Sequence, residues 1–335
     1  MSDGTNASVR DLCDDDRNVR QAAEDRLVAL GVQAVDTLLP YAAERDPSRL
    51  KWGAESVLQR LGDEALPRLR EIRRQGPGRL RSDALTVLLD LGGAEHLDER
   101  DRRAVERLVH IRLKDERPVR VPSEAGRWLA FPADRLDDAV AALGLHDLRP
   151  ATTVMGVAAA TKSQDSIEFK ESQGKTQTAY RVFITPAFET WLSEVPIQNW
   201  CMLWGNSFID QLDGFALADR LSERCGEAHL YVLDPYNRAE NWYVSRDGRS
   251  VRSFGTYDEP QFQGEPLPFE VEHREDADED EAEEYAEGVP YAMTAADYLS
   301  VEPGRMPASG THGHGWLATT RPDVPNSRFK GALPL

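Results

Sequence analysis

"RQAAEDRLVALG" (residues 20–31), "KWGAESVLQRLG" (51–62) and "RSDALTVLLDLG" (81–92) are three copies of one pattern. In the first copy Ala23, Leu27 and Leu30 stand at i, i+4 and i+7, which is the spacing of one face of an α-helix. A glycine ends each copy, and glycine suits a helix end that needs a positive φ. A second apolar segment with helical spacing follows each of the first two copies. The pattern therefore predicts stacked helical hairpins, an all-α solenoid over residues 8–115.

The first copy resembles the short bacterial form of the HEAT repeat. The residues that carry this resemblance are Val19, Arg20, Ala22, Ala23, Leu27, Leu30 and Gly31. The later copies keep the alanine, the leucines and the glycine, here Gly62 and Gly92, but have Leu-Lys and Leu-Arg where the first has Val-Arg. Residues 99–113 form a weaker fourth unit that we expect to act as a cap. The resemblance implies a scaffold that binds chiefly proteins and sometimes nucleic acid.

Three cations, Arg20, Lys51 and Arg81, recur three residues before the repeated alanine. The resemblance implies that their helices line the concave face of the solenoid, where the cations would contact a partner. The alternative is an internal ladder in which the cations pair with Asp16, Asp46 and Asp83. We favour the ladder for the fold, because such pairs set the register of repeats.

A denser basic run extends from Arg68 to Arg81. It consists of Arg68, Arg70, Arg73, Arg74, Arg79 and Arg81. Clustered arginines on one helix can bind a phosphate backbone, so Arg73 and Arg74 are candidate nucleic-acid contacts. Solvated arginines on an ordinary helix are the commoner explanation.

The repeat ends near residues 115–125, and the pattern of residues 125–269 predicts an α+β domain with a mostly antiparallel sheet. Strands are expected at "RWLAF" (127–131), "ATTVMGVAAA" (151–160), "AYRVFITP" (179–186), "NWCMLWG" (199–205), "AHLYVLD" (228–234) and "LPFEVE" (267–272). Helices are expected at residues 132–144 and 214–226. Two alternating runs flank Asp247-Gly248, which predicts a β-hairpin.

This second half also loosely resembles a bacterial domain of immunity or interaction proteins. The resemblance is carried by "VFITPAFETWLSEV" (182–195), "LADRLSERCGEAHLYVLD" (217–234) and "NWYVSRDGRSVRSFG" (241–255). Trp242 and Arg252 match its hairpin, and both are candidate partner-binding residues. Arg252 is the hairpin residue whose type the turn and the cross-strand packing do not explain.

Charge and composition set further expectations. Residues 270–288 include eleven carboxylates and one arginine, which predicts a disordered acidic segment within a chain of net charge −18. Residues 289–335 are expected to pack on the α+β domain. The basic and apolar start of a signal peptide is absent, and so is an apolar run long enough for a membrane span. Three scattered cysteines fit a cytoplasmic protein.

We expect no catalytic, cofactor or metal site. The sequence has no Walker loop, nucleophile elbow, HExxH or dinucleotide motif. Cys225 with His229 is the best nucleophile–base pair, but an inert thiol is the commoner case. The histidines of "THGHG" (311–315) make an incomplete metal site.

These observations predict a non-catalytic cytoplasmic protein that binds another protein, in its most specific form an immunity or antagonist protein acting on a toxin or effector. The alternatives are a nucleic-acid-binding solenoid that uses the Arg68–Arg81 run, and an unrecognised enzyme with a site in the second domain. No membrane partner is expected.

Overall fold

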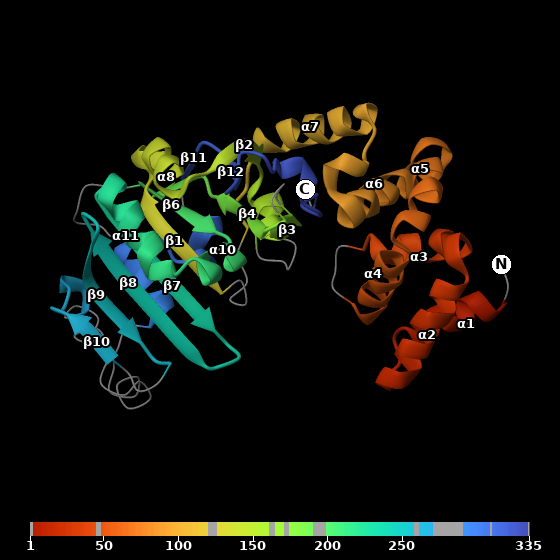
Figure 1. Cartoon of the computed structure of the whole chain (residues 1–335), viewed down its shortest axis with the longest axis horizontal. Coiled ribbons are helices and arrows are strands. Elements are labelled where there is room, and N and C mark those ends of the chain that lie inside the picture. Colours follow the sequence, from red (N-terminus) through yellow and green to blue (C-terminus); the bar gives the residue numbers. More distant parts are fainter. Residues whose placement is uncertain are drawn as a thin grey trace. The chain divides into compact units, whose positions relative to one another are not determined.

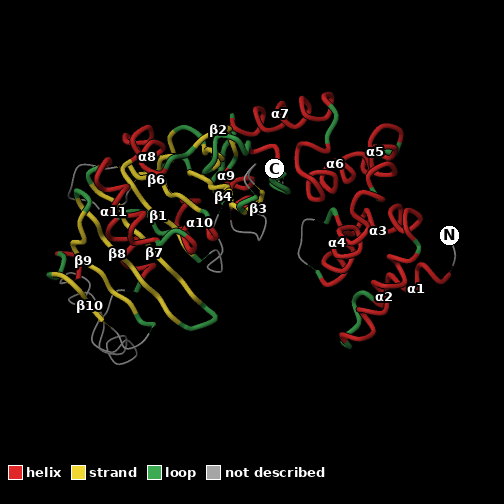
Figure 2. The backbone as a smooth tube through the Cα atoms, viewed as in Figure 1, coloured by secondary structure: helices red, strands yellow, loops and turns green. Residues whose placement is uncertain are grey.

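The structure is a computed structural model that describes residues 3–44, 48–119, 126–160, 165–170, 174–189, 199–257, 261–270, 291–308, 310–333 and 335. The chain forms two compact units, Met1–Glu106 with Ser327–Pro334, and Arg107–Asn326 with Leu335. Within the described residues, the first unit is helical and the second contains the strands (Figures 1 and 2). The predicted fold class, an all-α region followed by an α+β domain, is confirmed.

The helical unit is a succession of helices, three of whose connections are 3₁₀ turns (Figure 1). Its helices are α1 (Asp3–Asp11), α2 (Arg17–Ala29), α3 (Val35–Ala42), α4 (Arg49–Leu61), α5 (Leu66–Gln75), α6 (Gly78–Gly92) and α7 (Glu99–Leu113). The joining turns are η1 (Gly31–Ala34), η2 (Gly62–Glu64) and η3 (Gly93–His96). This succession is compatible with a solenoid.

The repeated apolar residues form the core of this unit. Ala23, Ala54, Ala84, Leu27, Leu58 and Leu88 are each at most 1% exposed. Leu30 differs from its counterparts Leu61 and Leu91, because it is 37% exposed and they are buried. The small alanines allow neighbouring helices to approach, and the leucines fill the space between them.

The glycines that adopt a positive φ after the helices are Gly31, Gly62 and Gly93, with φ of 58°, 52° and 68°. The sequence pattern placed the third one at Gly92, which was wrong by one residue: Gly92 has φ −150° and still belongs to α6. The three glycines therefore follow one another at a constant spacing, which the alanines do not.

The second unit contains one mixed-length sheet in the order β10-β9-β8-β7-β1-β6-β4-β12-β2. Its strands are β1 (Arg127–Pro132), β2 (His146–Ala151), β4 (Thr176–Ile184), β6 (Asn199–Trp204), β7 (Glu227–Asp234), β8 (Ala239–Arg246), β9 (Arg249–Gly255), β10 (Gln261–Gly264) and β12 (Gly315–Thr319). Off this path lie β3 (Ser166–Lys170), β5 (Ala187–Glu189) and β11 (Thr311–His312). All described strand pairs are antiparallel.

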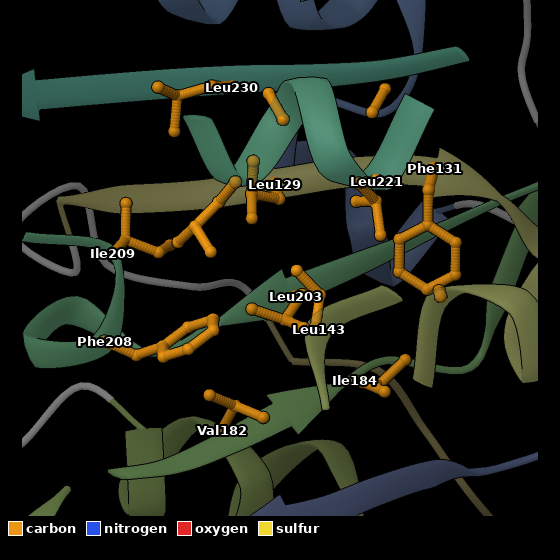
Figure 3. Close-up of a cluster of buried hydrophobic side chains, with 14 of the residues drawn as sticks. Leu129, Phe131, Leu143, Val182, Ile184, Leu203, Phe208, Ile209, Leu221 and Leu230 are labelled. Atoms are coloured by element: carbon orange, nitrogen blue, oxygen red, sulfur yellow. The ribbon is translucent and has the colours of Figure 1, made fainter. Parts of the chain in front are cut away.

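One face of the sheet is covered by α8 (Leu136–Leu143), α10 (Asn206–Gln211) and α11 (Gly214–Cys225). In the buried cluster of Figure 3, Leu143 and Leu221 from the helices pack with Leu129, Phe131 and Leu203 from β1 and β6. Side chains alternate between the two faces along a strand, so the residues before and after Leu129, Phe131 and Leu203 point to the opposite face of the sheet.

The other face carries the larger aromatic side chains and is packed by α9 (Thr153–Ala160) and α14 (Ala292–Leu299). Trp128 stacks on Trp204 and on Tyr231, with ring centroids 5.2 and 5.1 Å apart. Gly156 of α9 lies so close to Phe183 that a Cβ there would be 2.1 Å from the ring. Helices thus cover both faces of the sheet.

Two of the predicted strands are wrong. Residues 153–160 form α9 because the run is rich in alanine, which favours helix over strand. The hydroxyl of Thr152 accepts a hydrogen bond from the Met155 amide and caps this helix. Residues 267–270, the described part of "LPFEVE", also form no strand.

The Asp247-Gly248 hairpin is confirmed as the turn between β8 and β9. Both residues have positive φ, 47° and 74°, as a two-residue turn of this kind requires. The expected strands over 127–131, 179–186, 199–205 and 228–234 and the helices over 132–144 and 214–226 are present as well.

The two units divide at other residues than the sequence suggested. The division falls inside α7, and residues 327–333, expected to pack on the α+β domain, group with the helical unit. The acidic segment 270–288 lies outside the described residues except for Glu270. Among the described helices, none combines the length and the apolar character that crossing a membrane requires.

Candidate functional site

Two of the three repeated cations, Arg20 and Lys51, bond to backbone carbonyls at or after the end of the preceding helix. Arg20 donates from Nη1 to the carbonyls of Asp14 and Asp15, at 2.7 and 2.9 Å. Lys51 donates to the carbonyl of Ala42, the last residue of α3, and to that of Glu44 just after it. A cation at this position stabilises the carbonyls that a helix end leaves without partners. Arg20 and Lys51 therefore serve the fold through backbone carbonyls. Asp46, one of the aspartates predicted for a ladder, lies outside the described residues, and Arg81 is exposed.

Ion pairs between successive repeats do occur, and they involve the basic run. Arg68 forms a two-pronged contact with Asp36, at 2.7 and 2.5 Å, and this contact raises the pKa of the Arg68 guanidinium. Arg73 pairs with Asp101 at 2.7 Å, and Arg74 lies 3.6 Å from Asp98.

Arg70 of the same run donates to the carbonyl of His96. Four of the six arginines of the run therefore already bind acidic or carbonyl oxygens of their own unit. A phosphate backbone would compete with these contacts for Arg73 and Arg74.

A second set of contacts joins α2 to α4. Arg60 lies 2.7 Å from Asp25 and 3.6 Å from Glu24, and the hydroxyl of Ser56 donates to Glu24 at 2.7 Å. The hydrogen bond with Arg60 lowers the pKa of Asp25. These side chains are about as far apart in sequence as one repeat, so the contacts hold neighbouring repeats in register.

In the sheet unit, the two candidate binding residues are inside. Trp242 is fully buried and packs against Phe254, Phe262 and Phe269. Arg252 is 5% exposed. Because both side chains are buried, neither is exposed for contact with a partner.

A buried ion pair explains the identity of Arg252. Its Nε and Nη2 donate to the two carboxylate oxygens of Glu270, at 2.9 and 2.7 Å. Its Nη1 donates to the carbonyl of Gly264, and the guanidinium lies 4.3 Å from the centroid of the Phe262 ring. Glu270 also accepts from the Leu267 amide. Arg252 thus fastens the segment after β10 to the hairpin.

The structure also reveals a buried chain of polar groups that the sequence analysis did not identify. His229 Nε2 lies 3.0 Å from Glu227 Oε1, and His229 Nδ1 lies 3.2 Å from the Tyr231 hydroxyl. This hydroxyl is 3.0 Å from the hydroxyl of Ser300, and Trp200 packs against the His229 ring. We call Glu227, His229, Tyr231 and Ser300 the polar chain. Its signal in the sequence is the spacing of Glu227, His229 and Tyr231, which places all three on one face of β7.

The electrostatics of the polar chain favour an ionised carboxylate at its outer end. Burial acts to raise the pKa of Glu227, but the contacts with His229 and then Arg246 outweigh it and bring the pKa to about 2. Burial raises the pKa of the Tyr231 hydroxyl at the inner end. His229, Tyr231 and Ser300 are buried. The arrangement can order the proton donors and acceptors of the sheet interior, and Ser300 ties α14 to β7.

The candidate nucleophile and base lie apart. Cys225, the last residue of α11, belongs to the buried cluster between the helices and one face of the sheet. The side chain of His229 lies on the opposite face of β7. Burial raises the pKa of Cys225 to about 11 and that of Cys201 to about 12, so both thiols are protonated near neutral pH. His312 contacts Glu189 at 2.7 Å. Among the described residues, no three metal-ligating side chains come together.

Several large apolar side chains are exposed. In the helical unit Trp52 on α4 is the largest of them and is 58% exposed. In the sheet unit Tyr236, in the turn between β7 and β8, is 97% exposed. Aromatic side chains in such positions bind strongly when a partner covers them.

Comparisons of the chain with family models, with curated proteins and with solved structures gave no match. The resemblance of residues 8–115 to HEAT repeats, and that of the second half to an immunity-type domain, therefore stay predictions from the sequence.

Proposed function

We propose that this protein acts by binding another protein through the exposed side of its helical unit, with Trp52 as the central apolar contact. The observation that carries the proposal is the exposure of Trp52 on a regular helix. Exposing an indole to water is unfavourable, and tryptophan is among the residues that contribute most to protein interfaces.

The repeat itself does not require a tryptophan there. The buried face of α4 consists of Gly53, Ala54, Val57, Leu58 and Leu61. The residue before Gly53 has polar counterparts in the other copies, Gln21 in the first and Ser82 in the third. The fold of the other copies is thus made with small or polar side chains where this one has an indole.

The paired state of the basic side chains in the helical unit supports a protein partner over nucleic acid. Arg20 and Lys51 bond to carbonyls of their own unit, and most of the basic run bonds to acidic or carbonyl oxygens. Lys51 also lies 3.1 Å from Glu55 on the next turn of α4. On α4, Trp52 thus offers an exposed apolar contact next to the paired charges of Lys51 and Glu55.

Affinity capture with Trp52→Gln tests the proposal, because glutamine is the residue of the first copy. The unaltered chain is expected to capture a stoichiometric protein from its native host, and Trp52→Gln to weaken that complex by about 2 kcal/mol, or ~30-fold in Kd. Tyr236→Gln is the matched control, since it removes an exposed aromatic from the other unit and should leave Kd unchanged. Absence of a stoichiometric partner, or equal loss with both variants, would refute the proposal.

The specific form that we propose is antagonism of a toxin or effector protein in the cytoplasm. It is supported by the sequence resemblance of the second half alone. The unpaired state of Cys13, Cys201 and Cys225 is in keeping with a reducing compartment.

A further inference from the structure

Residues 327–333, which we call the docking segment, form part of the helical unit although they follow the whole sheet unit in sequence. Phe329 is 1% exposed, and Ala332 and Leu333 are buried. The amide of Gly331 donates to the carbonyl of Leu89 in α6 at 3.0 Å. The docking segment starts in the 3₁₀ turn η7 (Asn326–Arg328), has positive φ at Gly331 and Ala332, and is therefore held as an irregular segment against α6.

Gly93, the first residue of η3, makes room for this segment. A Cβ at Gly93 would lie 2.2 Å from the carbonyl oxygen of Phe329 and 3.0 Å from that of Ser327. Gly31 and Gly62 occupy the same place in the earlier repeats with the same positive φ, and a Cβ at either would meet nothing within 4 Å. Of these three equivalent glycines, Gly93 is the one that a bound peptide approaches closely.

We propose that the surface of α6 and η3 is a binding site for a short segment of a partner protein, with an aromatic residue followed three and four residues later by a small and an aliphatic one. The docking segment, with Phe329, Ala332 and Leu333, fills this site in cis, and the partner replaces it. The site lies apart from Trp52 in sequence and repeat, so it stands or falls independently of the proposed function.

The cis segment competes with any added peptide, because it belongs to the same chain and its binding is intramolecular. Weakening it should open the site. The probe is a fluorescent synthetic peptide with the sequence of residues 327–335, and the readout is anisotropy. The full chain with Phe329→Ala is expected to bind this peptide at least ~10-fold more tightly than the unaltered chain. A peptide carrying Phe329→Ala should not bind.

Gly93→Ala and Gly62→Ala, each added to the Phe329→Ala chain, separate the site from backbone strain. Both place a Cβ on a residue with positive φ, which costs a similar amount, but only the first collides with the peptide. We expect Gly93→Ala to weaken peptide binding more than ~10-fold and Gly62→Ala to change it less than ~3-fold.

A chain that ends at Asn326 provides a second way to open the site, and circular dichroism checks that each variant keeps its helices. If neither opened chain binds the peptide, or if Gly62→Ala weakens binding as much as Gly93→Ala, the proposal is wrong. A peptide site that behaves as expected while Trp52→Gln has no effect would leave this inference standing and refute the proposed function.

Discussion

Arg60 in the helical unit and Arg252 in the sheet unit make the same kind of ion pair in opposite surroundings. Arg60 reaches Asp25 at the surface, where its side chain is 40% exposed. Arg252 reaches Glu270 in the interior, where both side chains are almost fully buried. Water screens the first pair and solvates either charge if the pair breaks, whereas a charge of the second pair has no solvent to replace its partner. The pair in the helical unit sets register at little energetic gain, and the pair in the sheet unit must be complete for the fold to hold.

The largest effect that we predict concerns the buried pair. Arg252→Met leaves the carboxylate of Glu270 buried without its cation, so the free energy of unfolding of the sheet unit should fall by about 3–5 kcal/mol. The double variant Arg252→Met/Glu270→Leu removes both charges and should recover much of this loss. Urea unfolding followed by tryptophan fluorescence measures both. Equal losses in the single and double variants would contradict a cost that arises from the unpaired carboxylate.

An intermediate effect is expected at Glu227, and it depends on pH. Its pKa in the folded protein, about 2, lies below the ordinary value of 4.5, so its stabilising contribution is complete above pH ~4.5. The contribution is lost as the pH falls from 4.5 toward 2, by at most about 3 kcal/mol.

Glu227→Gln cannot titrate, so its free energy of unfolding should depend less steeply on pH between 4.5 and 2 than that of the unaltered chain. The difference between the two unfolding curves isolates this carboxylate from the others. Parallel curves would mean that the polar chain does not hold Glu227 in its ionised form.

The smallest effect belongs to the surface pair. Arg60→Ala should lower Tm by less than about 2 °C, and 1 M salt should abolish the difference, because exposed ion pairs contribute little and are screened. Differential scanning calorimetry at low and high salt checks this. A loss as large as that of Arg252→Met would erase the contrast between the two units.

The two units also differ in how far apart in sequence their contacting residues lie, and this difference explains which parts of the fold can be predicted from the sequence. The helical unit depends on neighbours one repeat apart, and the spacing of Ala23, Leu27 and their copies shows this directly in the sequence. The hairpin at Asp247-Gly248 is similarly local. The segment 153–160 was misread because a short apolar run fits a strand or a buried helix, and its alanine content decided for the helix.

The candidate sites were harder to predict because their partners are distant in sequence. Arg252 was noted as unexplained, but its partner Glu270 lies in another segment, at the start of the acidic run. Tyr231 and Ser300 are separated by much of the sheet unit. The exposure of Trp52 depends on how the surrounding helices pack, which the repeat pattern does not specify.

The position of the docking segment has a consequence for synthesis on the ribosome. The helices against which it packs emerge before residues 107–326, and the segment itself is made only afterwards. At ~5–20 residues per second, α6 and η3 wait on the order of tens of seconds for their last neighbour. During translation, a chaperone or an early-arriving partner therefore meets Gly93 before Phe329 has been made.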